Sequence, residues 1–112
     1  MGRPAKSVED TRRFVTMVAA HQGWRPIAEA EFLETLVQGL TTNHNRYGYY
    51  LCPCRDTLGA RDQDRDVICP CTYARADIEE YGHCFCALYQ SPEFQARGEE
   101  PRSIPERSPG RS

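Results

Sequence analysis

All six cysteines of this 112-residue chain lie between positions 52 and 86, where they form three Cys-x-Cys pairs. Fourteen residues separate the first pair from the second, and twelve separate the second from the third. A tetrahedral zinc ion and a 4Fe-4S cluster each take four protein ligands, so six thiols exceed either site by two. Two further thiols held together can cycle between dithiol and disulfide. The pairs are Cys52-Pro53-Cys54, Cys69-Pro70-Cys71 and Cys84-Phe85-Cys86.

The division of the thiols into four and two predicts an iron-sulfur site beside a redox-active pair. A cluster supplies electrons one at a time, whereas reduction of a disulfide needs two. The side chains of a Cys-x-Cys pair tend to diverge, and a central proline fixes φ and stiffens the backbone between them. One sulfur can therefore face the cluster while the other faces away. Tyrosines that flank the pairs are expected to shield the cluster from water: Tyr47, Tyr49, Tyr50, Tyr81 and Tyr89.

Three other interpretations of the cysteine pattern stay open. The first is a disulfide framework of a secreted protein, which the lack of a signal sequence disfavours. The second is a zinc-binding interaction module, although zinc sites usually use Cys-x2-Cys spacing. The third is a non-enzymatic electron carrier whose two additional cysteines take no part, although incidental cysteines would not fall so regularly into pairs.

Composition and charge argue against several classes of partner and location. The net charge is −2, so neither a nucleic-acid footprint nor a membrane-surface patch is indicated. The longest mostly apolar run, residues 14–20, is far too short to span a bilayer. The first residues lack the apolar core of a secretory leader, which predicts a cytoplasmic protein with reduced thiols.

Two amphipathic helices are expected before the cysteine pairs. Ser7 followed by Asp10 resembles a capping box, and apolar residues at helical spacing predict a first helix over residues 8–21. A second helix fits residues 27–45, because its apolar side chains fall on one face. Gly39 lies inside that helix at a cost of about 1 kcal/mol relative to alanine, and close packing against the first helix is the expected reason.

Little regular structure is expected between and after the pairs. Residues 61–66 alternate in charge and predict a solvated loop, residues 77–82 predict one short helical turn, and residues 91–94 a last turn. No strand shows convincing alternation. The chain should therefore be mainly α, with a flexible arm (1–6), a domain (7–96) and a disordered, charged and proline-rich tail (97–112).

The cysteine motifs and their surroundings resemble the catalytic chain of ferredoxin-thioredoxin reductase. The resemblance covers about residues 8–96 and leaves the tail outside. It is carried by the three paired motifs with these flanking residues: Glu34-Thr35-Leu36-Val37-Gln38-Gly39-Leu40, Tyr47-Gly48, Leu51-Cys52-Pro53-Cys54-Arg55, Cys69-Pro70-Cys71 and Gly82-His83-Cys84-Phe85-Cys86-Ala87-Leu88-Tyr89.

This resemblance implies a small helical domain wrapped around a 4Fe-4S cluster. It also implies that Cys54 and Cys86 form the redox-active disulfide, with Cys54 the exposed thiol that attacks the substrate. Electrons would pass from ferredoxin, or a similar one-electron donor, to thioredoxin or a thioredoxin-like protein. In the plant-type system the catalytic chain pairs with a small variable subunit, and a homodimer is the alternative here. The cluster ligands implied by the family are Cys52, Cys69, Cys71 and Cys84.

The chain departs from the family pattern at two points. Phe85 stands where the family usually has a histidine that is thought to assist proton transfer to the active-site thiols. The first spacer between pairs is shorter and the second is longer than in plant-type members. His83, directly before a predicted ligand, is a candidate to take over the proton-transfer role, and the alternative is that it only hydrogen-bonds to groups around the ligand cysteine.

Overall fold

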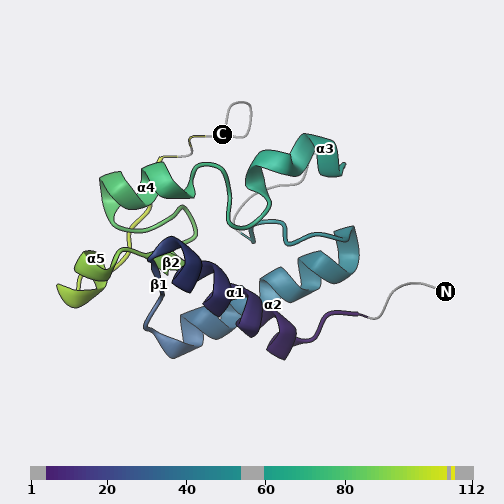
Figure 1. Ribbon diagram of the computed structural model, residues 1–112, viewed down its shortest axis with the longest axis horizontal. Helices are drawn as coiled ribbons and strands as arrows, with labels where there is room; N and C mark the ends of the chain where they lie inside the picture. Colours follow the sequence, from purple (N-terminus) through teal and green to yellow (C-terminus); the bar gives the residue numbers. More distant parts are fainter. Residues whose placement is uncertain (1–4, 54–59, 106, 108–112) are drawn as a thin grey trace.

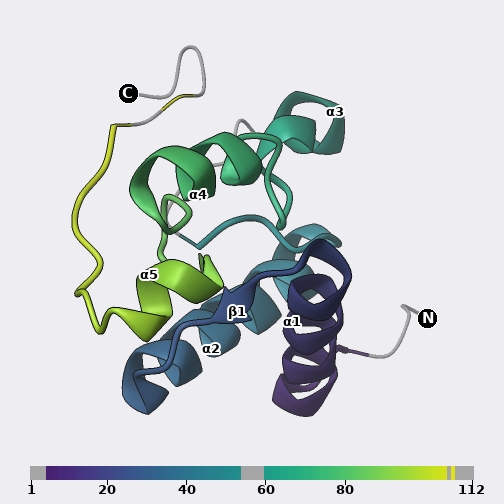
Figure 2. The same cartoon turned by 60° about the vertical axis from the view of Figure 1, so that its left-hand side comes forward.

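The computed structural model describes residues 5–53, 60–105 and 107. Two long helices, α1 (Val8–Gln22) and α2 (Ala30–Tyr47), pack side by side (Figure 1). The short helix α3 (Arg61–Asp64) and α4 (Ala74–Tyr81) lie on the other side of the cysteine-bearing segments (Figure 2). The described part of the chain is thus mainly helical, as predicted.

Helix α1 begins and ends where its sequence indicates. The Ser7 hydroxyl accepts from the Asp10 N–H (3.0 Å), and the Asp10 carboxylate accepts from the Ser7 N–H (3.1 Å). This reciprocal capping box satisfies two helix-terminal donors. Gly23 ends the helix with a φ of 79°, which a residue without Cβ adopts at little cost. The predicted helix over residues 8–21 is confirmed.

Helix α2 begins three residues later than predicted. The Glu29 carboxylate accepts from the N–H groups of Glu31 and Phe32, so Glu29 is the cap. Ile27 instead lies in extended chain, and its N–H donates to the Leu88 carbonyl (2.8 Å). Tertiary pairing therefore takes this residue out of the helix that its apolar periodicity suggests.

A two-stranded antiparallel sheet joins the segment after α1 to the segment after the last cysteine pair. Strand β1 (Arg25–Pro26) follows α1, and β2 (Tyr89–Gln90) follows the last cysteine pair. Two residues per strand are too few to produce an alternating pattern, so no strand was predicted there. The pairing fixes the last cysteine pair against the α1–α2 layer.

The loop expected over residues 61–66 is helical instead, although most of its residues are exposed as expected. Arg61–Asp64 form α3, and a 3₁₀ turn, η1 (Arg65–Val67), continues it. Asp64 is fully buried, and its carboxylate accepts from the Tyr49 hydroxyl (2.5 Å). Charge alternation predicts solvation, but here a tyrosine far along the chain supplies the hydrogen bond that burial of an acid requires.

Two short helices follow the second pair, and each has one end that the sequence predicts. Helix α4 starts three residues before the predicted turn and stops at Gly82 (φ 91°), as expected. Helix α5 (Pro92–Ala96) has Ser91 as its cap, whose hydroxyl accepts from the Phe94 N–H (3.0 Å). Both ends are encoded locally, by a cap or a glycine.

The described part of the tail, residues 97–105 and Arg107, follows the surface next to α4. Ile104, its single large apolar side chain, is buried, with 7% of its surface exposed. Arg107 forms ion pairs with Asp77 and Glu80 on α4. The division of the chain into arm, domain and tail stays a prediction.

The core surrounds the cysteines. One cluster of buried residues joins apolar side chains of α1, α2 and α4 with Cys52, Cys69, Cys84 and Cys86. A second, smaller cluster of Tyr49, Leu51 and Val67 holds α3 and η1. Within the described ranges, no helix is long and apolar enough to cross a membrane.

Candidate functional site

Backbone pairing brings the first and second cysteine pairs together. Leu51 and Ile68, the residues just before each pair, form an isolated antiparallel bridge. The Cys52 N–H donates to the Val67 carbonyl (3.0 Å), and the Cys69 N–H donates to the Tyr50 carbonyl (2.7 Å). The first cysteines of these two pairs, Cys52 and Cys69, are therefore adjacent in space.

The third pair lies in a tight turn. The Ala87 N–H donates to the Cys84 carbonyl (2.9 Å), and the Cys84 N–H donates to the Tyr89 carbonyl (3.0 Å). Ala87 has a φ of 66°, which is unusual for a residue with a side chain and marks local strain. The turn places the Cys84 Sγ 4.0 Å from the Cys86 Sγ and 3.4 Å from the Tyr89 nitrogen.

All five cysteines that the structure describes line one small internal cavity, which we call the thiol cavity. Four are the predicted cluster ligands, and the fifth is Cys86. Cys71 is only half-buried; its carbonyl accepts from the Ala74 N–H (3.1 Å) at the start of α4. Cys54, the predicted attacking thiol, lies outside the described residues. The predicted ligands that share the cavity are Cys52, Cys69, Cys71 and Cys84.

The donor set of this cavity fits an iron-sulfur cluster. Cysteine thiolates are the usual cluster ligands, four to each 4Fe-4S cluster, and four predicted ligands face this one space. In the described part of the chain, no three His, Cys, Asp or Glu side chains are placed to hold a single metal ion. The thiols therefore surround the cavity without meeting at one point.

The thiols differ in their electrostatic surroundings. Burial raises the pKa of the Cys69 thiol well above its ordinary value, and the neighbouring Cys52 adds to the effect. Hydrogen bonding to Cys86 lowers the pKa of the Cys84 thiol despite its burial. The two thiols are thus inequivalent before any ligand is considered.

Of the flanking tyrosines among the described residues, only Tyr89 lines the cavity. It is 1% exposed, and its hydroxyl lies 3.7 Å from the Cys69 Sγ. Burial raises the pKa of its phenol, so the side chain is neutral. The centroid of its ring lies 5.5 Å from that of the Trp24 ring. The other flanking tyrosines do not line the cavity: Tyr47, Tyr49, Tyr50 and Tyr81.

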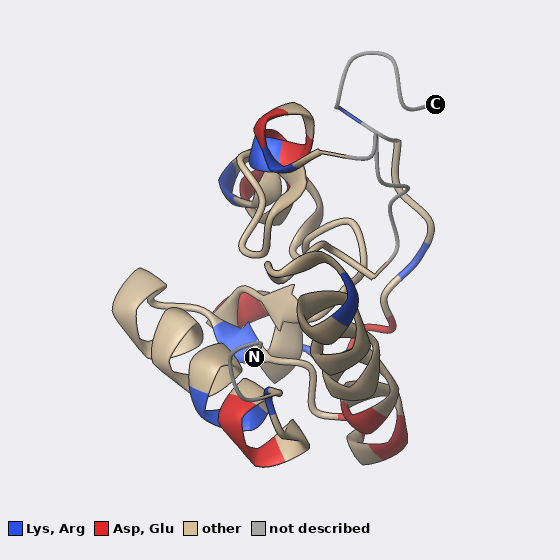
Figure 3. Cartoon of the chain, turned by 90° about the vertical axis from the view of Figure 1, so that its right-hand side faces the viewer, with Lys and Arg blue, Asp and Glu red and all other residues tan. Residues whose placement is uncertain are grey.

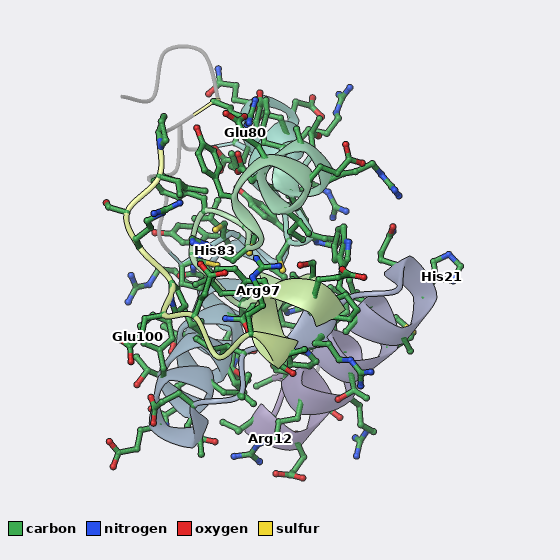
Figure 4. All side chains as sticks on the ribbon, turned by 90° about the vertical axis from the view of Figure 1, so that its left-hand side faces the viewer. Arg12, His21, Glu80, His83, Arg97 and Glu100 are labelled. Atoms are coloured by element: carbon green, nitrogen blue, oxygen red, sulfur yellow. The ribbon has the colours of Figure 1, made fainter. Side chains whose placement is uncertain are left out.

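His83 is fully buried, and both ring nitrogens contact backbone groups. Nε2 accepts from the Arg102 N–H (3.2 Å), so Nδ1 carries the proton and donates to the Cys84 carbonyl (2.8 Å). The ring packs edge-on against Phe94, with centroids 5.4 Å apart. Figure 4 shows His83 beside the tail segment, near the gathered sulfur atoms. These contacts tie the turn of the third pair to the tail, and the predicted proton-transfer role stays a prediction.

Gly39 does not pack against α1, contrary to expectation. A Cβ at this position would lie 3.2 Å from the Pro53 Cβ, so the close neighbour is the first cysteine pair. This contact joins residues 14 positions apart, which no local pattern reveals. The glycine therefore lets Pro53, the middle residue of the first pair, lie directly on α2.

Side-chain size at position 39 should matter more than helix propensity. We expect Gly39→Ala to change the free energy of unfolding by less than about 1 kcal/mol, because the helix gain offsets the tight contact. Gly39→Leu should destabilise by about 2 kcal/mol through overpacking against Pro53. Denaturant unfolding measures both. Thr42→Leu, at an exposed position of the same helix, is the control, and equal stability of the two leucine variants would contradict the assigned contact.

A second pocket lies on the side of Cys86 that faces away from the thiol cavity. It lies between the start of α2 and the tail, has a volume of about 590 Å³, and includes Phe85, Cys86 and Ala87 in its lining. We call it the Cys86 groove; its walls are residues 27–29 with Phe32, and residues 98–103. Cys86 and Phe85 thus border both the thiol cavity and the Cys86 groove.

Comparison with known proteins gives a consistent family. Residues 3–107 match the family model described as ferredoxin thioredoxin reductase catalytic beta chain. The chain is also similar to the chloroplastic ferredoxin-thioredoxin reductase catalytic chain of Arabidopsis thaliana, with 30% identity over 97 residues. The match covers 85% of this chain and 64% of that relative, so the chain spans slightly less than two thirds of the relative's length.

Proposed function

The chain belongs to the ferredoxin thioredoxin reductase catalytic beta chain family, and we propose that it is an iron-sulfur disulfide reductase. Its electron donor is a ferredoxin-like one-electron carrier, and its substrate is the disulfide of thioredoxin or a thioredoxin-like protein. The name of the Arabidopsis relative and the match over residues 3–107 support this assignment.

The observation that carries the proposal is the position of Cys86 between two spaces. On one side is the cavity that the predicted cluster ligands line, and on the other is the Cys86 groove. A reductase of this type needs a thiol that borders both the electron source and the substrate. Only 6% of the Cys86 surface is exposed, so its thiol is shielded from bulk water between these two spaces.

The thiol cavity is the proposed cluster site. Cys52, Cys69, Cys71 and Cys84 would hold a 4Fe-4S cluster there. When bound, the cluster supplies single electrons to chemistry that needs two. Tyr89 and the buried apolar neighbours exclude water from these thiols, which is one of the means by which a protein sets a cluster's potential.

The disulfide exchange itself uses Cys54 and Cys86. The Cys54 thiolate attacks one sulfur of the partner's disulfide, forming a mixed disulfide and releasing the other partner sulfur as a thiolate. The Cys86 thiolate then attacks the Cys54 sulfur, which forms the Cys54–Cys86 disulfide and releases the partner as a dithiol. The partner gains two electrons and two protons, and the donor restores the pair by giving two electrons, one at a time.

Metal and sulfide analysis tests whether the chain binds the proposed cluster. We expect anaerobically purified protein to contain iron and acid-labile sulfide in equal amounts, about four of each per chain. It should also reduce a thioredoxin-like disulfide when given a one-electron donor. Elemental analysis, the visible spectrum and thiol counting measure these properties. Zinc without sulfide would contradict the proposal and favour an interaction module, while a cluster without disulfide reduction would favour an electron carrier.

A further inference from the structure

The Cys86 groove offers more room than contact with a single sulfur requires. Its volume of about 590 Å³ lies in the range of sites that enclose whole ligands. Apolar side chains from both walls line it, among them Ile27, Phe32 and Pro101. Phe32 is 44% exposed, one of the few large apolar side chains in the described residues that reach the surface. Such a groove is suited to a stretch of polypeptide that carries side chains on both sides of a cysteine.

Both walls of the groove carry acidic residues. Glu29 lies in the α2 wall, and Glu99 and Glu100 lie in the tail wall, against one basic lining residue, Arg102. Figure 3 shows acidic residues in red at the start of α2 and on the tail. Glu29 is engaged as the α2 cap, and Glu99 forms an ion pair with Arg97. With Arg97 counted beside Glu99, three carboxylates stand against two guanidiniums, which leaves the groove with a small net negative charge.

The tail wall is held in place by contacts on both sides of the acidic pair. Before it, the Gly98 N–H donates to the Gln95 carbonyl (3.1 Å), and Gln95 itself donates to the Pro26 carbonyl (2.8 Å). After it, the Arg102 N–H donates to His83 Nε2 (3.2 Å). Figure 4 shows Glu100 on this segment. A wall fixed at two points presents its charges without a large ordering cost on binding.

We propose that the Cys86 groove docks the polypeptide segment around the partner's disulfide and selects partners that carry Lys or Arg beside it. This rests on the proposed function and deepens it, because it names the chemistry that the substrate must present. The apolar lining receives the side chains next to the disulfide, and the acidic walls attract the basic ones. Charge complementarity of this kind sets specificity and association rate.

Peptide binding to the full, cluster-loaded chain tests the docking step separately from reduction. Two short cyclic peptides would be compared, identical except that two Lys or two Glu flank the closing bridge. For binding, the bridge is a non-reducible thioether, and fluorescence anisotropy gives the Kd. We expect the Lys peptide to bind about tenfold tighter at low salt, and the difference to shrink as salt shortens the Debye length.

Charge reversal on the tail wall should remove the preference. The double variant Glu99→Lys with Glu100→Lys is expected to lose the tenfold difference or to favour the Glu peptide. The matched control is Asp62→Lys with Glu79→Lys, which makes the same change in net charge at exposed sites on α3 and α4 outside the groove. An unchanged preference in the tail variant, or an equal loss in the control, would overturn the proposal.

Disulfide-closed versions of the same peptides separate this proposal from the proposed function. Reduction of both peptides at equal rates would overturn the charge selection and leave the reductase assignment standing. The expected binding preference without any reduction would leave docking standing and overturn the reductase. Displacement of the Lys peptide by glutathione disulfide at equal affinity would show a small-molecule pocket and overturn polypeptide docking.

Discussion

Cys69→Ser is expected to abolish cluster binding, whereas Cys54→Ser is expected to keep the cluster and lose disulfide reduction by about 1,000-fold or more. Cys69 is buried in the thiol cavity, and its backbone is pinned to the bridge beside the first pair. Serine keeps the size of the side chain but removes the thiolate ligand. Iron and sulfide content with the visible spectrum measures the first effect, and a thioredoxin-like disulfide assay the second.

Cys86→Ser distinguishes the roles of the two thiols in the proposed reactive pair. Without the resolving thiol, the mixed disulfide between Cys54 and the partner should accumulate, because nothing else attacks the Cys54 sulfur. Mass spectrometry under non-reducing conditions would detect this covalent complex. Cluster loss in Cys54→Ser, or cluster retention in Cys69→Ser, would show that the division of the six thiols into ligands and reactive pair is wrong.

The contacts of the tail should contribute several kcal/mol to the stability of the domain. Arg107→Ala would leave the fully buried Asp77 carboxylate without its guanidinium partner, and its Oδ2 already has no hydrogen-bond partner among the described residues. The Asp77 carboxylate is buried but the Arg107 side chain is 32% exposed, so the loss should cost about 2 kcal/mol, less than in a fully buried pair. Ile104→Ala should cost about 2 kcal/mol through the lost burial and the cavity that remains. Denaturant unfolding monitored by circular dichroism gives both values.

Two variants make the tail experiment specific. Arg97→Ala breaks only an exposed ion pair with Glu99 and should change the free energy of unfolding by less than about 1 kcal/mol. Adding Asp77→Asn to Arg107→Ala should recover part of the loss, because the buried group is then neutral. If the tail is disordered as its composition predicts, Ile104→Ala and Arg107→Ala will both leave stability unchanged.

Local patterns in the sequence predicted the parts of this fold that depend on nearby residues. The Ser7 capping box, Gly23 and Gly82 set helix ends through contacts within one or two turns, and each is found where expected. The apolar periodicity of the two long helices likewise reports a face that must be buried. The exact start of α2 was missed, because Ile27 pairs with Leu88 across the molecule.

Two buried contacts show the same limit. Asp64 lies in a charged run that reads as solvated, yet it is buried because Tyr49 hydrogen-bonds to it from another segment. Gly39 reads as a helix–helix contact, yet its neighbour is Pro53. In both cases the deciding partner is distant in sequence, and pattern reasoning has no access to it.

The thiol inventory can be read from the residues alone: three cysteine pairs, six thiols, and therefore two more than one four-ligand site uses. Thiol count and spacing are covalent facts that need no fold. Folding is what places Cys86 between the thiol cavity and the Cys86 groove, and what makes the tail a wall of that groove. Those relations arise from the β1–β2 pairing and the contact of Arg102 with His83, which join segments far apart in the chain.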